Sequence, residues 1–134
     1  MIIDGMKLHH IGYVVDNCTV AAKTYCNIFC EREIYTENVK SQVVNIALVK
    51  EGETWIEFIE PASPDSPVYE FACRGGGFHH LCYEVDDINS YIEQLKSDWK
   101  VIVPPVIGFM GRWTCFLFAK NNNQTNSLIE LVQR

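Results

Sequence analysis

The chain has 134 residues, 48% of them hydrophobic and 21% charged, and a formal net charge of −6. This length suffices for one domain that buries about two-thirds of the surface its unfolded chain exposes, so folding needs neither a metal nor a disulfide. The negative charge and the absence of clustered Lys and Arg exclude nucleic acid and anionic membrane surfaces as partners. No apolar run approaches the roughly 20 residues that span a bilayer, so we expect a soluble protein with a small-molecule partner.

The six cysteines form no C-x-x-C pair, and no signal peptide precedes them. Such cysteines are typical of reduced thiols packed as small hydrophobic side chains. We therefore expect a cytoplasmic protein without disulfides.

In the first half of the chain, the alternation of Ile11, Tyr13 and Val15 predicts a strand over 7–15. Asp16 or Asn17 can cap the helix that follows. The β-favouring composition farther on predicts a run of extended segments. These segments lie at about 33–36, 41–49 and 54–60.

A proline-rich connector follows, in which Ser66 and Pro67 are expected to begin a short helix that ends at about Cys73. Glycines 75 to 77 can then adopt backbone angles that are closed to other residues. We expect one domain over 1–134, with module one at about 7–61, a connector at about 62–77 and module two at about 78–134.

The second half repeats the order of the first. A strand at 78–85 leads into a helix after Asp86 and Asp87, which has an apolar stripe. A loop with Pro104, Pro105 and residues 108–111 is expected before a strand at 113–119, and the last strand is expected at 127–132. Each half is therefore predicted to be a β-α-β-β-β module.

The duplication also places the same residue types at matching positions. An offset of 70 residues pairs His10 with His80, and an offset of 73 pairs Glu57 with Glu130. Carboxylates inside hydrophobic strands are rarely buried without a partner. For any one of these residues, a hydrogen-bonded structural role is the alternative.

Two imidazoles and two carboxylates together suit divalent ions of the Mn, Fe, Co, Ni and Zn series. We therefore predict a metal site made by His10, Glu57, His80 and Glu130, with two open positions for a chelating substrate. Adjacent strand residues point to opposite faces, so His9 and His79 are expected to be packed elsewhere or to act as caps. Two further carboxylates are expected to be solvated, namely Glu60 and Glu84.

Five segments spread over nearly the whole chain carry a resemblance to a known family. The segments are His10-Ile-Gly-Tyr-Val-Val, Ile56-Glu-Phe-Ile-Glu-Pro61, Ser63-Pro-Asp-Ser-Pro67, His79-His-Leu-Cys-Tyr-Glu-Val-Asp-Asp-Ile88 and Leu128-Ile-Glu-Leu131. They resemble the vicinal oxygen chelate superfamily, and within it most closely the methylmalonyl-CoA epimerase branch. The resemblance implies an α+β, glyoxalase-like fold in which two tandem β-α-β-β-β modules form a curved mixed sheet around a central site. It also implies one divalent ion (Co, Ni, Zn or Mn) on the four residues above.

The chain departs from the epimerase pattern at two places. Asn45 stands where these epimerases often carry an acidic residue as a second base, and an amide cannot transfer that proton. The loop at 108–113 is also altered. Asn45, Arg112 and Trp113 are candidate substrate-binding residues, with Arg112 as an anchor for a carboxylate or phosphate.

The resemblance implies a metal-dependent enzyme that abstracts a proton next to a carbonyl, with the metal stabilising the enediolate and Glu130 as the acid-base residue. The substrate would be an acyl-CoA or another thioester or carbonyl compound, and a homodimer is a candidate assembly. One alternative is a lyase similar to glyoxalase I (lactoylglutathione lyase). The other is a non-catalytic binding or resistance protein of the same fold.

Overall fold

The computed structural model describes residues 5–29, 33–121 and 128–134. The chain divides into two compact units. The N-terminal unit is His10–His79, and the C-terminal unit is His80–Arg134 together with the first nine residues. A single domain over 1–134 stays a prediction. Over the described ranges, none of the helices is both long and apolar enough to cross a bilayer.

The N-terminal unit is a four-stranded arrangement in the order β2-β3-β4-β1. β2, β3 and β4 pair antiparallel, whereas β1 runs parallel to β4. This is the predicted β-α-β-β-β order, followed by a short helix. The elements are β1 (Lys7–Val14), α1 (Cys18–Phe29), β2 (Ile34–Val39), the 3-10 turn η1 (Lys40–Gln42), β3 (Val44–Glu51), β4 (Thr54–Pro61) and α2 (Tyr69–Cys73).

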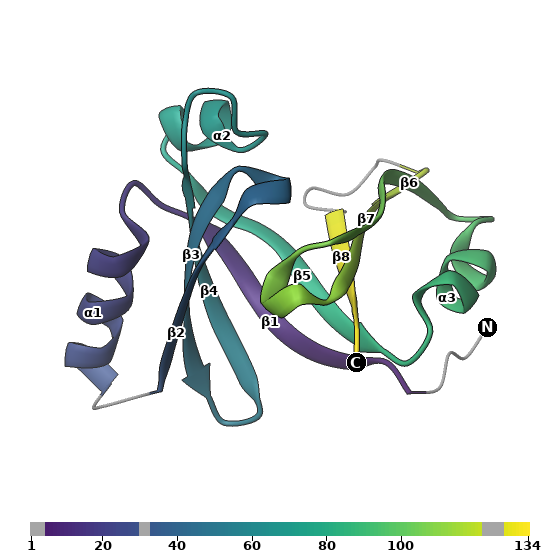
Figure 1. Cartoon of the computed structure of the whole chain (residues 1–134), viewed down its shortest axis with the longest axis horizontal. Helices are drawn as coiled ribbons and strands as arrows, with labels where there is room; N and C mark the ends of the chain where they lie inside the picture. The colour runs from purple at the N-terminus through teal and green to yellow at the C-terminus, as the bar shows by residue number, and fades with distance from the viewer. Residues whose placement is uncertain (1–4, 30–32, 122–127) are drawn as a thin grey trace. The chain divides into compact units, whose positions relative to one another are not determined.

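Helix α1 lies against β3 and β4 of this unit (Figure 1). Cys18 and Ala22 of the helix form a buried cluster with Ala47 and Val49 of β3. Asn17 caps the helix, because its Oδ1 accepts a hydrogen bond of 3.0 Å from the Val20 backbone N–H. The predicted cap is confirmed, and α1 covers one face of the unit's sheet.

The short helix α2 begins later than the sequence predicts. Its N-cap is Val68 and its first residue is Tyr69. Ser66 instead closes a turn, because its carbonyl accepts from the Tyr69 N–H at 3.0 Å and its Oγ accepts from the Val68 N–H at 3.3 Å. The prediction of a helix start at Ser66 and Pro67 is therefore wrong, because the Ser66 hydroxyl and carbonyl form a turn before the helix begins.

The C-terminal unit repeats the same plan in the order β6-β7-β8-β5. β5 runs parallel to β8, and β6, β7 and β8 pair antiparallel. Helix α3 lies against β6, β7 and β8. The predicted duplication is confirmed. The elements are β5 (Gly77–Val85), α3 (Ile88–Leu95), β6 (Trp99–Ile107), the 3-10 turn η2 (Phe109–Gly111), β7 (Trp113–Ala119) and β8 (Leu128–Gln133).

Helix α3 is capped and packed as its pattern predicts. The Asp87 carboxylate accepts hydrogen bonds from the backbone N–H groups of Asn89 and Ser90, at 3.1 and 3.4 Å. Ile88 and Tyr91 enter a buried cluster with residues of β7 and β8. The predicted start of the last strand at residue 127 lies outside the described residues.

Strand β6 corrects the expected loop at Pro104 and Pro105. Both prolines lie inside the strand. β6 is last in the strand order of the unit, and its pairing with β7 shifts register between Val101 and Val103 and again before Val106. Proline has no N–H to donate, so it is tolerated in such an outer, irregular strand.

Candidate metal centre

The N-terminal unit holds a buried pair made by His10 of β1 and Glu57 of β4. Their Nε2 and Oε1 atoms are 3.2 Å apart. His10 is 0% and Glu57 5% exposed. Gly12 lies beside Glu57 in the parallel β1–β4 register, and Leu48 lies opposite it on β3. Because side chains alternate along a strand, His10 and Glu57 share one face.

This face is opposite the one that α1 covers. The helix packs on Ala47 and Val49, which alternate with Leu48 along β3. Phe58 of β4 packs against the same cluster. The hydrophobic face therefore anchors the helix, and the other face presents the His–Glu pair.

The C-terminal unit holds the matching pair, His80 of β5 and Glu130 of β8. Their Nε2 and Oε1 atoms are 3.0 Å apart, and both residues are buried. Cys82 lies beside Glu130 in the register, as Gly12 lies beside Glu57 in the other unit. Helix α3 covers the opposite face. The predicted matching positions are thus occupied by the same contact in each unit.

Two side chains of β7 contact this second pair and were not predicted. The Thr114 hydroxyl lies 2.5 Å from Glu130 Oε2 and donates to it. Phe116 packs edge-on against the His80 ring, with 5.4 Å between centroids. Thr114 is the one residue of β7 with a hydroxyl group, and this polar residue in a hydrophobic strand could have indicated a buried hydrogen-bond partner.

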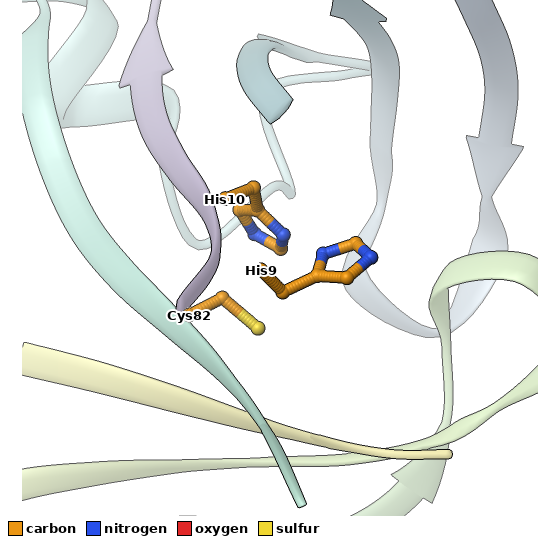
Figure 2. A group of neighbouring side chains, drawn as sticks. All are labelled: His9, His10 and Cys82. Carbon is orange, nitrogen blue, oxygen red and sulfur yellow. The ribbon is translucent and has the colours of Figure 1, made fainter. Parts of the chain in front are cut away.

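The first histidine of each His-His sequence packs against an aromatic ring of its own unit. His9 lies edge-on to Phe109, with centroids 5.3 Å apart, and His79 lies edge-on to Phe71 at 5.4 Å. Figure 2 shows His9 and His10, consecutive on β1, drawn with Cys82 of β5. The prediction that His9 and His79 are packed is confirmed. The five cysteines of the described part of the chain are not in disulfides.

Asn45 lies on the α1 face of β3. It is paired with Glu60, whereas Leu48 is paired with Glu57. Its Nδ2 donates to Glu60 Oε2 at 3.4 Å, and its Oδ1 accepts from Asn38 at 2.8 Å. Asn45 therefore does not share the face of the His10–Glu57 pair. Its role in substrate binding stays a prediction.

Glu60 is not solvated in the way the sequence suggested. Its Oε1 accepts a hydrogen bond of 3.0 Å from the Cys18 backbone N–H at the start of α1. A carboxylate there also complements the partial positive charge of the helix N-terminus. Glu60 thus ties β4 to the helix.

Arg112 is held inside the C-terminal unit. Its Nη2 donates to Glu84 Oε2 at 2.6 Å, and its Nε donates to the Gln133 carbonyl at 2.7 Å. Trp113, the next residue, is 46% exposed. Substrate-binding roles for Arg112 and Trp113 stay predictions.

Glu84 is likewise paired rather than solvated, and this lowers its pKa. Desolvation raises the pKa of Glu84, but the hydrogen bond and charge of Arg112, with the charges of His9 and Arg134, more than offset it. A carboxyl whose pKa is lower in the folded than in the unfolded chain stabilises the fold above its unfolded pKa. That stability is lost as the pH falls through the folded pKa.

Glu84→Gln should therefore lower the free energy of unfolding at pH 7 by about 1 kcal/mol, because it removes a charged hydrogen bond. The difference from the native chain should shrink as the pH falls below about 4. Urea unfolding at several pH values measures this. Glu93→Gln is the matched control, since the Glu93–Lys96 pair is 69% exposed on both sides and should change stability by less than about 0.5 kcal/mol. A loss of unfolding free energy in Glu84→Gln that does not change with pH would contradict a stabilising role of the ionised Glu84 carboxylate.

Comparison with known proteins identifies the family. The model for the Glyoxalase/Bleomycin resistance protein/Dioxygenase superfamily matches residues 9–116. Human mitochondrial methylmalonyl-CoA epimerase is 33% identical over 131 residues, which cover 95% of this chain and 73% of that protein. The ethylmalonyl-CoA/methylmalonyl-CoA epimerase of Cereibacter sphaeroides is 30% identical over 132 residues, 95% of this chain and 97% of that protein.

Solved structures agree with these sequence relatives. A variant of Streptomyces coelicolor methylmalonyl-CoA epimerase in complex with 2-nitronate-propionyl-CoA has a TM-score of 0.82 at 26% identity, covering 95% of this chain and 96% of that one. A methylmalonyl-CoA epimerase in complex with methylmalonyl-CoA and NH4+ has a TM-score of 0.84 at 26% identity, with 97% and 95% covered. The predicted α+β, glyoxalase-like fold is confirmed.

Proposed function

We propose that this chain, which belongs to the glyoxalase/bleomycin resistance protein/dioxygenase superfamily, is a metal-dependent epimerase that moves a proton next to the carbonyl of an acyl-CoA thioester. One observation carries the proposal: a buried His–Glu contact occurs at the same place in both units. Epimerase relatives at about 30% identity support an enzyme of the epimerase or isomerase kind. These epimerase relatives do not support the lyase alternative.

The donor atoms of the two pairs fit a divalent ion. Each pair offers one imidazole nitrogen and one carboxylate oxygen, and all four residues are buried. Imidazole with carboxylate suits Co, Ni, Zn and Mn, and two carboxylates balance the charge of such an ion. We propose that the two pairs together bind one ion. Such an ion supplies positive charge to the carbonyl oxygen that becomes anionic when the neighbouring carbon loses its proton.

The side chains of the chain itself carry the proton. We propose Glu130 as the residue that accepts the proton at a carboxylate oxygen on one face of that carbon and can return it there, and Glu57 as a ligand that keeps its charge throughout. Inversion requires a proton on the other face, and water would supply it. A carboxylate suits this work, because a positioned carboxylate can act as a general base and then as a general acid. Phe116 shields the His80 ring on one side and so limits the access of water to the pair.

The substrate class comes from the relatives. The Streptomyces epimerase binds a propionyl-CoA derivative, and a second structure contains methylmalonyl-CoA. We propose an acyl-CoA with an acidic carbon beside its thioester. A homodimer and a cytoplasmic location stay predictions, as does the non-catalytic alternative, a binding protein without metal.

We expect one divalent ion per chain. Elemental analysis of the native protein and titration of the metal-free protein with Co2+ measure it. His80→Ala should abolish stoichiometric uptake, because it removes one of four donors, and His79→Ala is the matched control, since His79 packs on Phe71. A native protein that takes up none of Mn, Co, Ni and Zn, or a His80→Ala variant that binds as the native chain does, would rule out the metal assignment.

The same preparation tests the reaction. The loaded protein should incorporate deuterium from solvent at the acidic carbon of methylmalonyl-CoA. Inversion at that carbon is measured separately, because it also needs a proton returned on the other face. Asn45 lies on the opposite face of β3 from the His10–Glu57 pair, so a slow inversion would not be attributed to the amide at position 45. A protein that holds its ion yet gives no exchange would favour a binding role.

A further inference from the structure

The C-terminal unit contains a buried hydroxyl that the proposed chemistry does not use. Thr114 is 0% exposed and lies on β7, opposite Val132 of β8. Its Oγ1 is 2.5 Å from Glu130 Oε2 and 3.0 Å from the Leu131 carbonyl. A hydroxyl has one proton to donate. The shorter distance and the negative charge direct that proton to the carboxylate.

The two oxygens of Glu130 are therefore held differently. Oε1 faces the His80 imidazole at 3.0 Å, and Oε2 accepts from Thr114. A carboxylate turns about its last side-chain bond with little preference, so these contacts fix the orientation of the carboxylate plane and keep one oxygen beside the histidine.

The N-terminal unit has no such donor at the matching position. In the C-terminal unit Phe116 lies opposite Glu130, and Thr114 lies two residues before it. In the N-terminal unit Leu48 lies opposite Glu57, and the residue two before it is Ile46. A side chain without a hydroxyl cannot hold the carboxylate in this way. The duplication has kept the His–Glu pair but differs at the residue that supports it.

We propose that Thr114 is a positioning residue, which fixes Glu130 so that Oε1 is the oxygen offered for metal binding beside His80. This inference rests on the proposed metal site. Partners of this kind orient a ligand without touching the ion, and their loss typically lowers metal affinity by about 10- to 100-fold.

The test titrates metal-free protein with Co2+ and compares three substitutions. Thr114→Val has nearly the same shape but no hydroxyl, and should weaken Co2+ binding by about tenfold or more. Thr114→Ser restores the donor and should bind within about threefold of the native protein. Ile46→Val changes the packing at the matching position of the other unit and should leave the affinity unchanged.

A second measurement needs no metal. In a double-mutant cycle of urea unfolding, Thr114→Val should lower the folding equilibrium constant about tenfold when Glu130 is present. It should lower that constant far less in a Glu130→Leu background, because the carboxylate partner is gone. This coupling reports the hydrogen bond itself.

The outcomes separate the two claims. If the native chain binds Co2+ and Thr114→Val binds it equally well, the positioning role is wrong and the metal site stands. If the native chain binds none of Mn, Co, Ni and Zn, the proposed function is wrong, and with it a role toward metal. Equal effects of Thr114→Val in both backgrounds of the cycle would overturn the positioning of Glu130 regardless of metal. Weak binding by Thr114→Val, rescued by Ser and accompanied by coupling, supports the inference.

Discussion

Glu130→Gln is expected to lower turnover by about 10²-fold or more while the protein still binds its ion. The amide keeps an oxygen that can act as a weak ligand, but it cannot accept and return a proton. Loss of a positioned acid-base group usually costs on this scale. The measurement is the rate of deuterium incorporation into methylmalonyl-CoA at saturating substrate and metal, with the metal content of each sample determined by elemental analysis.

Glu57→Gln is the matched control, because Glu57 makes the same contact with its own histidine. It should keep the ion and lose clearly less turnover, since Glu57 is proposed only to bind. An equal loss in both variants, with metal retained in both, would show that the two carboxylates are not divided into base and ligand. If both variants lose the ion, the lower turnover would instead reflect the loss of metal binding.

The candidate pairs could be predicted from the sequence because the duplication preserved them. His10 and His80 recur at one offset and Glu57 and Glu130 at nearly the same one, so one periodic pattern identifies residues far apart in the chain. The structure brings each His to the Glu of its own unit, through a parallel strand pair. A carboxylate inside a hydrophobic strand was the second signal, because burial demands a partner.

The face of Asn45 could not be predicted in the same way. Alternation along β3 is visible in the sequence, but both faces of that strand are apolar, so the pattern does not reveal which one meets α1. The register with β4 decides it, and a shift of one residue would reverse every side chain. Thr114 was missed for a related reason, since its partner is 16 residues away on β8.

The predictions for the two proline-containing segments are wrong for different reasons. Pro104 and Pro105 suggested a loop, yet an outer strand needs fewer of its N–H groups, so β6 continues through them. Ser66 and Pro67 have the right composition for a helix start, but the same residues also suit a turn. Local sequence preferences did not distinguish a loop from an outer strand in the first segment, or a helix start from a turn in the second.

Gly76→Ala is expected to destabilise the N-terminal unit strongly, by about 3 kcal/mol or more. Gly76 has a φ of 66°, where an L-residue is strained by roughly 1–2 kcal/mol. A Cβ at this position would also overlap the Val14 carbonyl oxygen. That oxygen belongs to the backbone at the end of β1, where the next residue donates to the Ile59 carbonyl at 2.9 Å. It therefore cannot turn aside as a flexible side chain would.

Gly52→Ala separates the overlap from the backbone strain. Gly52 lies in the turn between β3 and β4 with a φ of 63°, nearly the same as that of Gly76, but a Cβ there meets nothing within 4 Å. Its substitution should cost only the strain, about 1 kcal/mol. Urea unfolding of both variants gives the difference, which we assign to the contact between the glycine loop and β1. Equal costs for the two substitutions would mean that the loop moves away from Val14 freely, and that its glycines are needed for their backbone angles alone.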